Sequence, residues 1–296
     1  MKIFLVFISI LANIFAQNLK SVYNYKVIHK NIIYHQEPYI LIRSFNIDTK
    51  RYYLAVNSKN LTTKIIENKA FLREETEEKS RYEKALASYS KAPFNLQNYG
   101  LKKLDSKKIF LTMDMCPSSK IGYEDGFLAE IISKYKTLPI TFFISGRWIE
   151  KHKKEFLELI KLQKEKKLDI TWGNHTFNHF YHPNCSLEKN FILAPKTDLK
   201  KEILDLEKLL ISYSITPSIL FRFPGLVSDK KSIGIIKELG LIPVGSNAWL
   251  AKDEVIKEGS IILLHGNKNE PKGIEKARDF LIKKDDFNLG SILQEL

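Results

Sequence analysis

The chain has 296 residues, enough for one large domain or for one domain with a smaller appendage. Hydrophobic residues make up 44% and charged residues 27%, the balance of an ordinary soluble globular protein, which argues against a largely disordered chain. The net charge is +13, but no compact block of Lys and Arg stands out, so we expect no nucleic-acid partner.

The first residues have the layout of a secretory signal peptide. Met1-Lys2 supplies one positive charge, residues 3–15 form a short apolar run, and Ala16-Gln17 offers a small residue for cleavage. A membrane span needs about 20 apolar residues, so an uncleaved anchor is the less favoured alternative. We expect residues 1–16 to be removed, leaving an exported protein (periplasm, cell envelope or secreted) with no stable membrane span.

Residues 17–104 are polar and rich in tyrosine. Residues 39–42 and 51–56 are predicted as strands. Residues 71–89 are predicted as a largely solvated helix that ends before Pro93. No group of catalytic residues stands out here, and we predict a small α+β appendage.

From Lys108 onward, short apolar runs alternate with helical patterns. Strands are predicted at residues 109–112, 140–144, 168–172, 219–221, 241–244 and 260–264. Helices are predicted at residues 126–134, 148–166, 199–213, 228–239 (capped by Ser228) and 274–282. This alternation indicates an α/β domain over residues 105–296, with parallel strands and helices packed outside them.

Polar side chains cluster where these strands end. They are Asp114, His175, His179, Arg222, Trp249 and His265. Barrels and open parallel sheets place their chemistry at the carboxyl ends of strands, so these side chains should converge. If the chain turns helical after Trp172, His175 and His179 would lie on one face and share a divalent metal, with zinc favoured. The set is typical of metal-assisted hydrolysis.

The order of these residues resembles the polysaccharide deacetylases of the NodB-homology type, carbohydrate esterase family four. The matching patterns are Thr112-x-Asp114, Asn174-His175-Thr176-x-x-His179, Arg222-x-Pro224, Trp249 and Leu263-x-His265. The resemblance covers roughly residues 107–284 and implies a distorted (β/α) barrel. It also implies a metal-dependent enzyme that removes N-acetyl groups from an N-acetylglucosamine polymer, such as peptidoglycan or a surface glycan.

The resemblance also implies roles for single residues. Asp114 matches the general base, His175 and His179 match two metal ligands, and His265 matches the general acid that protonates the leaving amine. Arg222 matches an arginine that steadies the base. The implied substrate-binding residues are Pro224, Gly225, Trp249 and Leu263. An amide is a poor electrophile, which is why a Lewis acid and two proton-transfer groups are needed.

Two departures from the family pattern bear on these roles. Where the family has a second aspartate as third metal ligand, this chain has Met115, a weak zinc ligand. Glu124 and Asp125 are the favoured substitutes because they follow the same strand within a short loop. The alternatives are Asp114 itself, His182, Cys116 and water.

The second departure lies before Trp249. The family has an aspartate four residues before the tryptophan and Asp or Ser directly before it, where this chain has Gly245 and Ala248. Ser246 and Asn247 are neighbours that could partly substitute, but neither is a carboxylate. How the pKa values of the base and the acid would be tuned in this chain is therefore left open.

Cys116 and Cys185 both lie beside the predicted site. In order of preference, they form a disulfide, remain two buried free thiols, or supply one soft metal ligand. Two other functions also remain open: a glycan-binding relative that has lost catalysis, and an amidohydrolase acting on a small molecule, since a fold does not fix a substrate.

Overall fold

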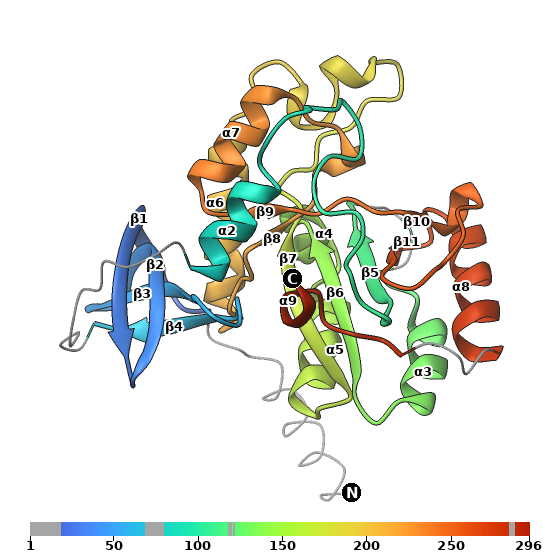
Figure 1. Ribbon diagram of the computed structural model, residues 1–296, viewed down its shortest axis with the longest axis horizontal. Helices are drawn as coiled ribbons and strands as arrows, with labels where there is room; N and C mark the ends of the chain where they lie inside the picture. Colours follow the sequence, from blue (N-terminus) through green and yellow to red (C-terminus); the bar gives the residue numbers. More distant parts are fainter. Residues whose placement is uncertain (1–18, 69–79, 118–119, 121, 284–287) are drawn as a thin grey trace, which may run out of the picture.

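The computed structural model describes residues 19–68, 80–117, 120, 122–283 and 288–296 (Figure 1). The predicted signal peptide lies outside these residues, as does the segment 71–79 of the predicted helix 71–89. Within the described ranges, no helix combines the length and the apolar character needed to cross a membrane.

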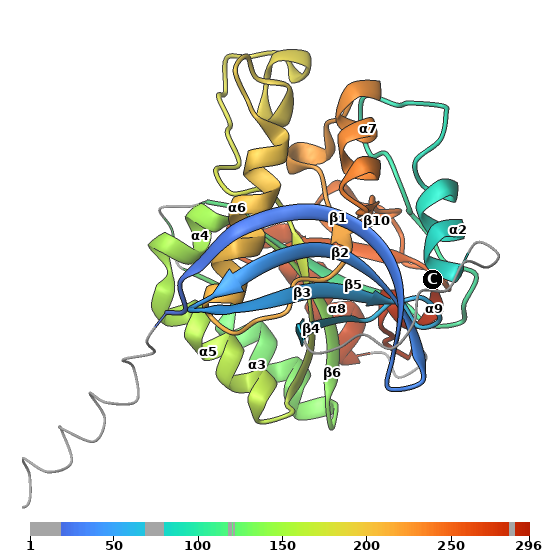
Figure 2. The same ribbon diagram turned by 90° about the vertical axis from the view of Figure 1, so that its left-hand side faces the viewer.

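An antiparallel four-stranded sheet begins the described chain. Its strands, in spatial order, are β1 (Val22–Tyr34), β2 (Glu37–Ile47), β3 (Lys50–Asn57) and β4 (Thr63–Glu67). The two strands predicted here are confirmed as parts of β2 and β3. Helix α2 (Arg81–Ser88) follows, and it begins at a capping box in which Ser80 and Glu83 satisfy each other's backbone N–H groups. Figure 2 shows this sheet in front of the larger part of the molecule.

The second sheet has seven parallel strands. Their order is β10 (Ala248–Trp249), β11 (Ile261–His265), β5 (Phe110–Met115), β6 (Leu138–Ile144), β7 (Leu168–Asn174), β8 (Leu220–Phe221) and β9 (Ile242–Pro243). The two outermost strands, β9 and β10, are joined by only four residues, which span at most about 17 Å. A flat sheet would separate them by about 29 Å. The sheet therefore curls, and the predicted distorted (β/α) barrel is confirmed.

The gap between the two edges is filled by residues 97–104. Leu101 pairs with Val244 beyond the end of β9, and Lys103 pairs with Ser260 at the start of β11. The segment before the first barrel strand thus closes the barrel. The predicted domain boundary between residues 104 and 105 stays a prediction.

Helices cover the outside of the curled sheet (Figure 1). They are α3 (Asp125–Lys134), α4 (Gly146–Lys151), α5 (Lys153–Lys164), α6 (Leu199–Ser212), α7 (Lys230–Glu238) and α8 (Pro271–Lys283), with the short α9 (Ile292–Glu295) near the C-terminus. The prediction of one helix over 148–166 is wrong, because the backbone of His152 leaves helical geometry and divides α4 from α5. The predicted cap Ser228 is also wrong. Asp229 caps α7 through the backbone N–H of Ser232, and the Ser228 hydroxyl bonds the Asn95 carbonyl instead.

The pleat of β5 divides its side chains between two environments. Leu111, Met113 and Met115 point outward into the apolar layer beneath the helices. Phe110 points to the interior of the barrel, where it packs with residues such as Phe143. Thr112, Asp114 and Cys116 share the parity of Phe110, so they also face inward, higher along the strand.

A buried ion pair ties the small sheet to the barrel. Arg43 of β2 and Glu207 of α6 are 0% and 1% exposed. The Arg43 guanidinium donates to both carboxylate oxygens of Glu207 at 2.7 and 2.9 Å, and to the carbonyl of Leu239 behind α7 at 2.8 Å. Tyr25 of β1 donates to the same carboxylate. Each charge is satisfied only while the two parts stay together.

We expect Glu207→Ala to lower the free energy of unfolding by about 3–5 kcal/mol, because it leaves the Arg43 guanidinium buried and unpaired. The double change Arg43→Met with Glu207→Leu should cost much less, since no charge is left behind. Urea unfolding measures both. Lys201→Ala, which breaks an exposed pair with Asp205 on the same helix, is the control and should change little. If the single and the double variant lost the same free energy of unfolding, the unpaired charge of Arg43 would not be the cause.

Candidate active site

The inward face of β5 is joined to β8 by a buried arginine. Arg222, which directly follows β8, donates 2.7 Å hydrogen bonds to the Thr112 hydroxyl and to Asp114 Oδ1. β5 and β8 are not neighbours in the sheet, so these contacts cross the interior of the barrel. The other guanidinium nitrogens donate to the carbonyls of Val244 and Gly245, at 3.3 and 2.9 Å. Every nitrogen of this 0% exposed guanidinium is therefore satisfied.

The charge of Asp114 is fixed by this pair. Burial would raise the pKa of its carboxyl group, but the Arg222 guanidinium, with His175 and His265 nearby, holds that pKa below its ordinary value. Asp114 Oδ1 is engaged by Arg222, whereas Oδ2 lies 3.9 Å from His175 Nε2. The second oxygen thus stays available as a proton acceptor.

The histidine pair is brought together by a tight loop and not by a helix. The expectation of a helical turn is wrong: Thr176 and His179 adopt left-handed backbone conformations, and Asn174 Oδ1 accepts from the Thr176 N–H. An asparagine that bonds the backbone two residues on favours such a turn over a helix. The rings of His175 and His179 nevertheless lie 4.8 Å apart, so the predicted convergence holds.

Each ring of the pair is oriented by its surroundings. His175 Nδ1 lies 2.7 Å from the Arg222 carbonyl, which only an N–H can satisfy, so Nε2 carries the lone pair that faces the site. The His179 ring packs edge-on against Phe191, whose ring in turn fills the space left beside Gly225. His179 Nε2 is buried with no hydrogen-bond partner among the described residues.

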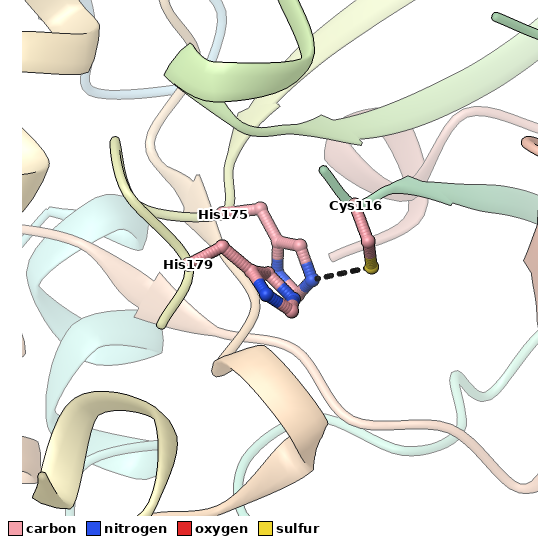
Figure 3. A group of neighbouring side chains, drawn as sticks. All are labelled: Cys116, His175 and His179. Atoms are coloured by element: carbon pink, nitrogen blue, oxygen red, sulfur yellow. Dashed lines mark hydrogen bonds between the residues drawn. The ribbon is translucent and has the colours of Figure 1, made fainter. Parts of the chain in front are cut away.

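The third member of this group is Cys116 (Figure 3). Its Sγ lies 3.7 Å from His175 Nε2, and the ligand atoms of Cys116, His175 and His179 all lie within 4.8 Å of one another. The Asn267 side-chain amide holds the backbone of Cys116 by donating to its carbonyl at 2.7 Å. We name these three side chains the Cys-His-His cluster. A buried imidazole nitrogen without a partner, beside a thiol and a second imidazole, fits a divalent metal.

The favoured disulfide is wrong: Cys116 and Cys185 are both free, the first buried and the second exposed. Cys116 belongs to the cluster, whereas Glu124 and Asp125, which the sequence favoured as the third metal ligand, do not. Alternation along β5 explains why. Met115 points outward, and the next inward position after Asp114 is Cys116.

Burial would raise the pKa of the Cys116 thiol, but His179, His175 and His265 lower it well below its ordinary value. The surrounding imidazoles thus favour the thiolate, which is the form that binds metals.

His265 ends β11 beside β5, and Asp114 is its partner in the strand register. Its Nδ1 lies 2.8 Å from Glu270 Oε2, and the Trp249 indole N–H donates to the same oxygen at 2.8 Å. Burial would lower the pKa of His265, but Cys116 and Glu270 raise it well above its ordinary value. Sequence reasoning missed Glu270, since it precedes a predicted helix and belongs to none of the matching patterns.

The remaining predicted residues frame the site. Leu263 is buried one pleat below His265, Pro224 is buried behind Arg222, and Trp249 is half-buried beside the His265 ring. Ser246 and Asn247 both bond the backbone of Ile261 and therefore support the strands. His182 bonds Asn190 in an exposed loop away from the cluster.

The assembled site can perform acid–base chemistry beside a metal. It holds an ionised carboxylate, a Cys-His-His cluster and a histidine on a carboxylate, all at the carboxyl ends of parallel strands. A metal at the cluster would have three protein ligands, which is the ligand number of catalytic zinc sites that keep one position open.

Comparison with known proteins gives consistent likenesses. A family 4 carbohydrate esterase from Bacillus anthracis is 25% identical over 71% of this chain and 89% of its own, with a TM-score of 0.46. The Bacillus subtilis family 4 carbohydrate esterase PdaA is 22% identical over 73% of this chain and 88% of its own, with a TM-score of 0.46. A family 4 pseudoenzyme from Bacillus anthracis is 12% identical over 97% of this chain and 93% of its own, also at 0.46.

The sequence model of the family described as polysaccharide deacetylase matches residues 101–244. The matched segment contains Asp114, the Cys-His-His cluster and Arg222, and it ends before Trp249 and His265. The likeness of this chain to the polysaccharide deacetylase family therefore lies in this segment.

Proposed function

We propose that the protein is an exported, metal-dependent deacetylase that removes N-acetyl groups from an N-acetylglucosamine-containing glycan. The single observation that carries the proposal is the convergence of Asp114, the Cys-His-His cluster and His265 in one site. Export rests on the N-terminal sequence pattern. The exposed rings of Phe180 and Tyr181, on the loop that leaves His179, support a sugar as substrate, since they offer an apolar surface beside the site.

Two side chains carry the protons. Asp114 takes a proton from the attacking water, and Arg222 keeps the carboxylate ionised and in place. His265 gives a proton to the nitrogen that leaves as the amine. The two groups stand on adjacent strands at the same level, so both can face one amide.

The metal would be held by Cys116, His175 and His179. When bound, it would supply the Lewis acidity that polarises the amide carbonyl and lowers the pKa of water. One thiolate and two imidazoles favour zinc over magnesium or calcium, which prefer oxygen ligands. Cys116 thus replaces the carboxylate for which the sequence has Met115.

A glycan-binding relative without catalysis is the second candidate. Gly245 and Ala248 favour it, because the family's carboxylate is missing there. It predicts saturable binding of the sugar with no release of acetate under any metal.

Acetate release from N-acetylglucosamine oligomers and from peptidoglycan tests the first proposal, with protein lacking residues 1–16. We expect release to stop on chelation and to return with zinc. Asp114→Asn and His265→Ala should each lower kcat by roughly 10²- to 10⁴-fold, because each removes a proton-transfer group. Asp169→Asn, an exposed carboxylate on β7 near the amino end of the barrel strands, is the matched control and should leave kcat unchanged. Full activity of either site variant would refute the roles assigned here.

Cobalt binding tests Cys116 without relying on catalysis. We expect Co²⁺ to give a thiolate-to-metal charge-transfer band in the near ultraviolet that Cys116→Ser abolishes. The same change should weaken zinc binding by more than about 100-fold, since second-shell changes alone cost about 10- to 100-fold. Cys185→Ser is the control, because Cys185 is exposed and outside the cluster. A band that persists in Cys116→Ser would assign the metal to other ligands.

A further inference from the structure

We propose that Glu270 is a positioning residue for His265, and that it supplies from the start of α8 the carboxylate that the family pattern places before Trp249. The inference rests on the proposed function. It assigns to Glu270 the task of holding the ring of His265 in one orientation, with Nδ1–H on the carboxylate and Nε2 left to give up the proton.

The first step is the contact itself. His265 Nδ1 and Glu270 Oε2 are 2.8 Å apart, and a carboxylate at this distance requires an N–H at Nδ1. The other ring nitrogen, Nε2, then points away from Glu270. A histidine whose one nitrogen bonds a carboxylate has the role of its other nitrogen fixed by that bond.

The second step is that Glu270 is itself held. Trp249 Nε1 donates to the same Oε2 atom at 2.8 Å, and the Trp249 backbone N–H donates to Glu254 at 2.6 Å. One oxygen of Glu270, the residue directly before α8, therefore bonds side chains of both β10 and β11. The Glu270 side chain is 28% exposed, so its charge is partly shielded from water.

The third step explains why the carboxylate comes from position 270. A Cβ atom on Gly245 would lie 2.4 Å from Asn98 Oδ1, which no real contact allows. Asn98 is fixed there, because its side chain accepts from the Ser246 N–H and donates to the Ser246 carbonyl. Ala248 points outward into the apolar layer beneath the helices. Neither family position can therefore direct a carboxylate at His265 in this chain.

Glu270→Ala, Glu270→Gln and Glu270→Asp test the inference in the full exported chain. We expect Glu270→Ala to lower kcat by about 10- to 100-fold with little change in KM, because a misplaced acid harms the chemical step and not binding. Glu270→Gln keeps an acceptor for the Nδ1 proton, so it should retain more activity than alanine. Glu270→Asp keeps the charge on a shorter side chain, and its activity should lie between those of the alanine and glutamine variants. Glu275→Gln, which removes an exposed charge from α8 without touching His265, is the control.

The ring nitrogens of His265 give a second readout that does not need activity. In ¹⁵N spectra of the metal-free protein, recorded at a pH high enough for the His265 ring to be neutral and assigned by the loss of signal in a His265 variant, Glu270→Ala should redistribute the ring proton between Nδ1 and Nε2. Unchanged ring signals, or a change in KM alone, would overturn the proposal. If the parent protein released no acetate, the proposed function would fail, while the nitrogen shifts would still decide what Glu270 does.

Discussion

The buried pair between Arg222 and Asp114 is the contact on which the rest of the site depends. Each N–H group of a fully buried arginine needs a hydrogen-bond acceptor. For Arg222, these acceptors come from β5 and from the chain after β9. Its own carbonyl then fixes His175. One residue thus sets the charge of Asp114, the tautomer of a cluster histidine and the distance across the barrel.

The curl of the sheet and the pleat of β5 do the remaining positioning. Curling brings strands that are not neighbours within reach of one another. Alternate residues of the pleated strand point inward, so the same strand places Thr112 and Asp114 against Arg222 and Cys116 against the histidines. The outward residues Met113 and Met115 belong to the helix layer. The strand backbone therefore sets where Thr112, Asp114 and Cys116 lie, and the tight loop after β7 adds the two histidines.

Much of this could be predicted from the sequence, because parallel strands and their polar ends leave a strong pattern. The convergence of Asp114, His175, Arg222 and His265 follows from strand ends alone. Cys116 could have been favoured over Glu124 and Asp125 by counting two residues on from Asp114, had the strand been taken to extend through Met115. Glu270 could not, since its contact with His265 depends on where α8 begins in space.

The contact between Asn98 and Gly245 makes the two positions depend on each other. Asn98 belongs to the segment that closes the barrel, and its amide occupies the place that a side chain at position 245 would need. An aspartate at position 245 would require position 98 to change as well, and that change would remove the two bonds to Ser246. A single substitution at position 245 is therefore opposed by a residue that lies outside the strands of the barrel, in the segment that closes it.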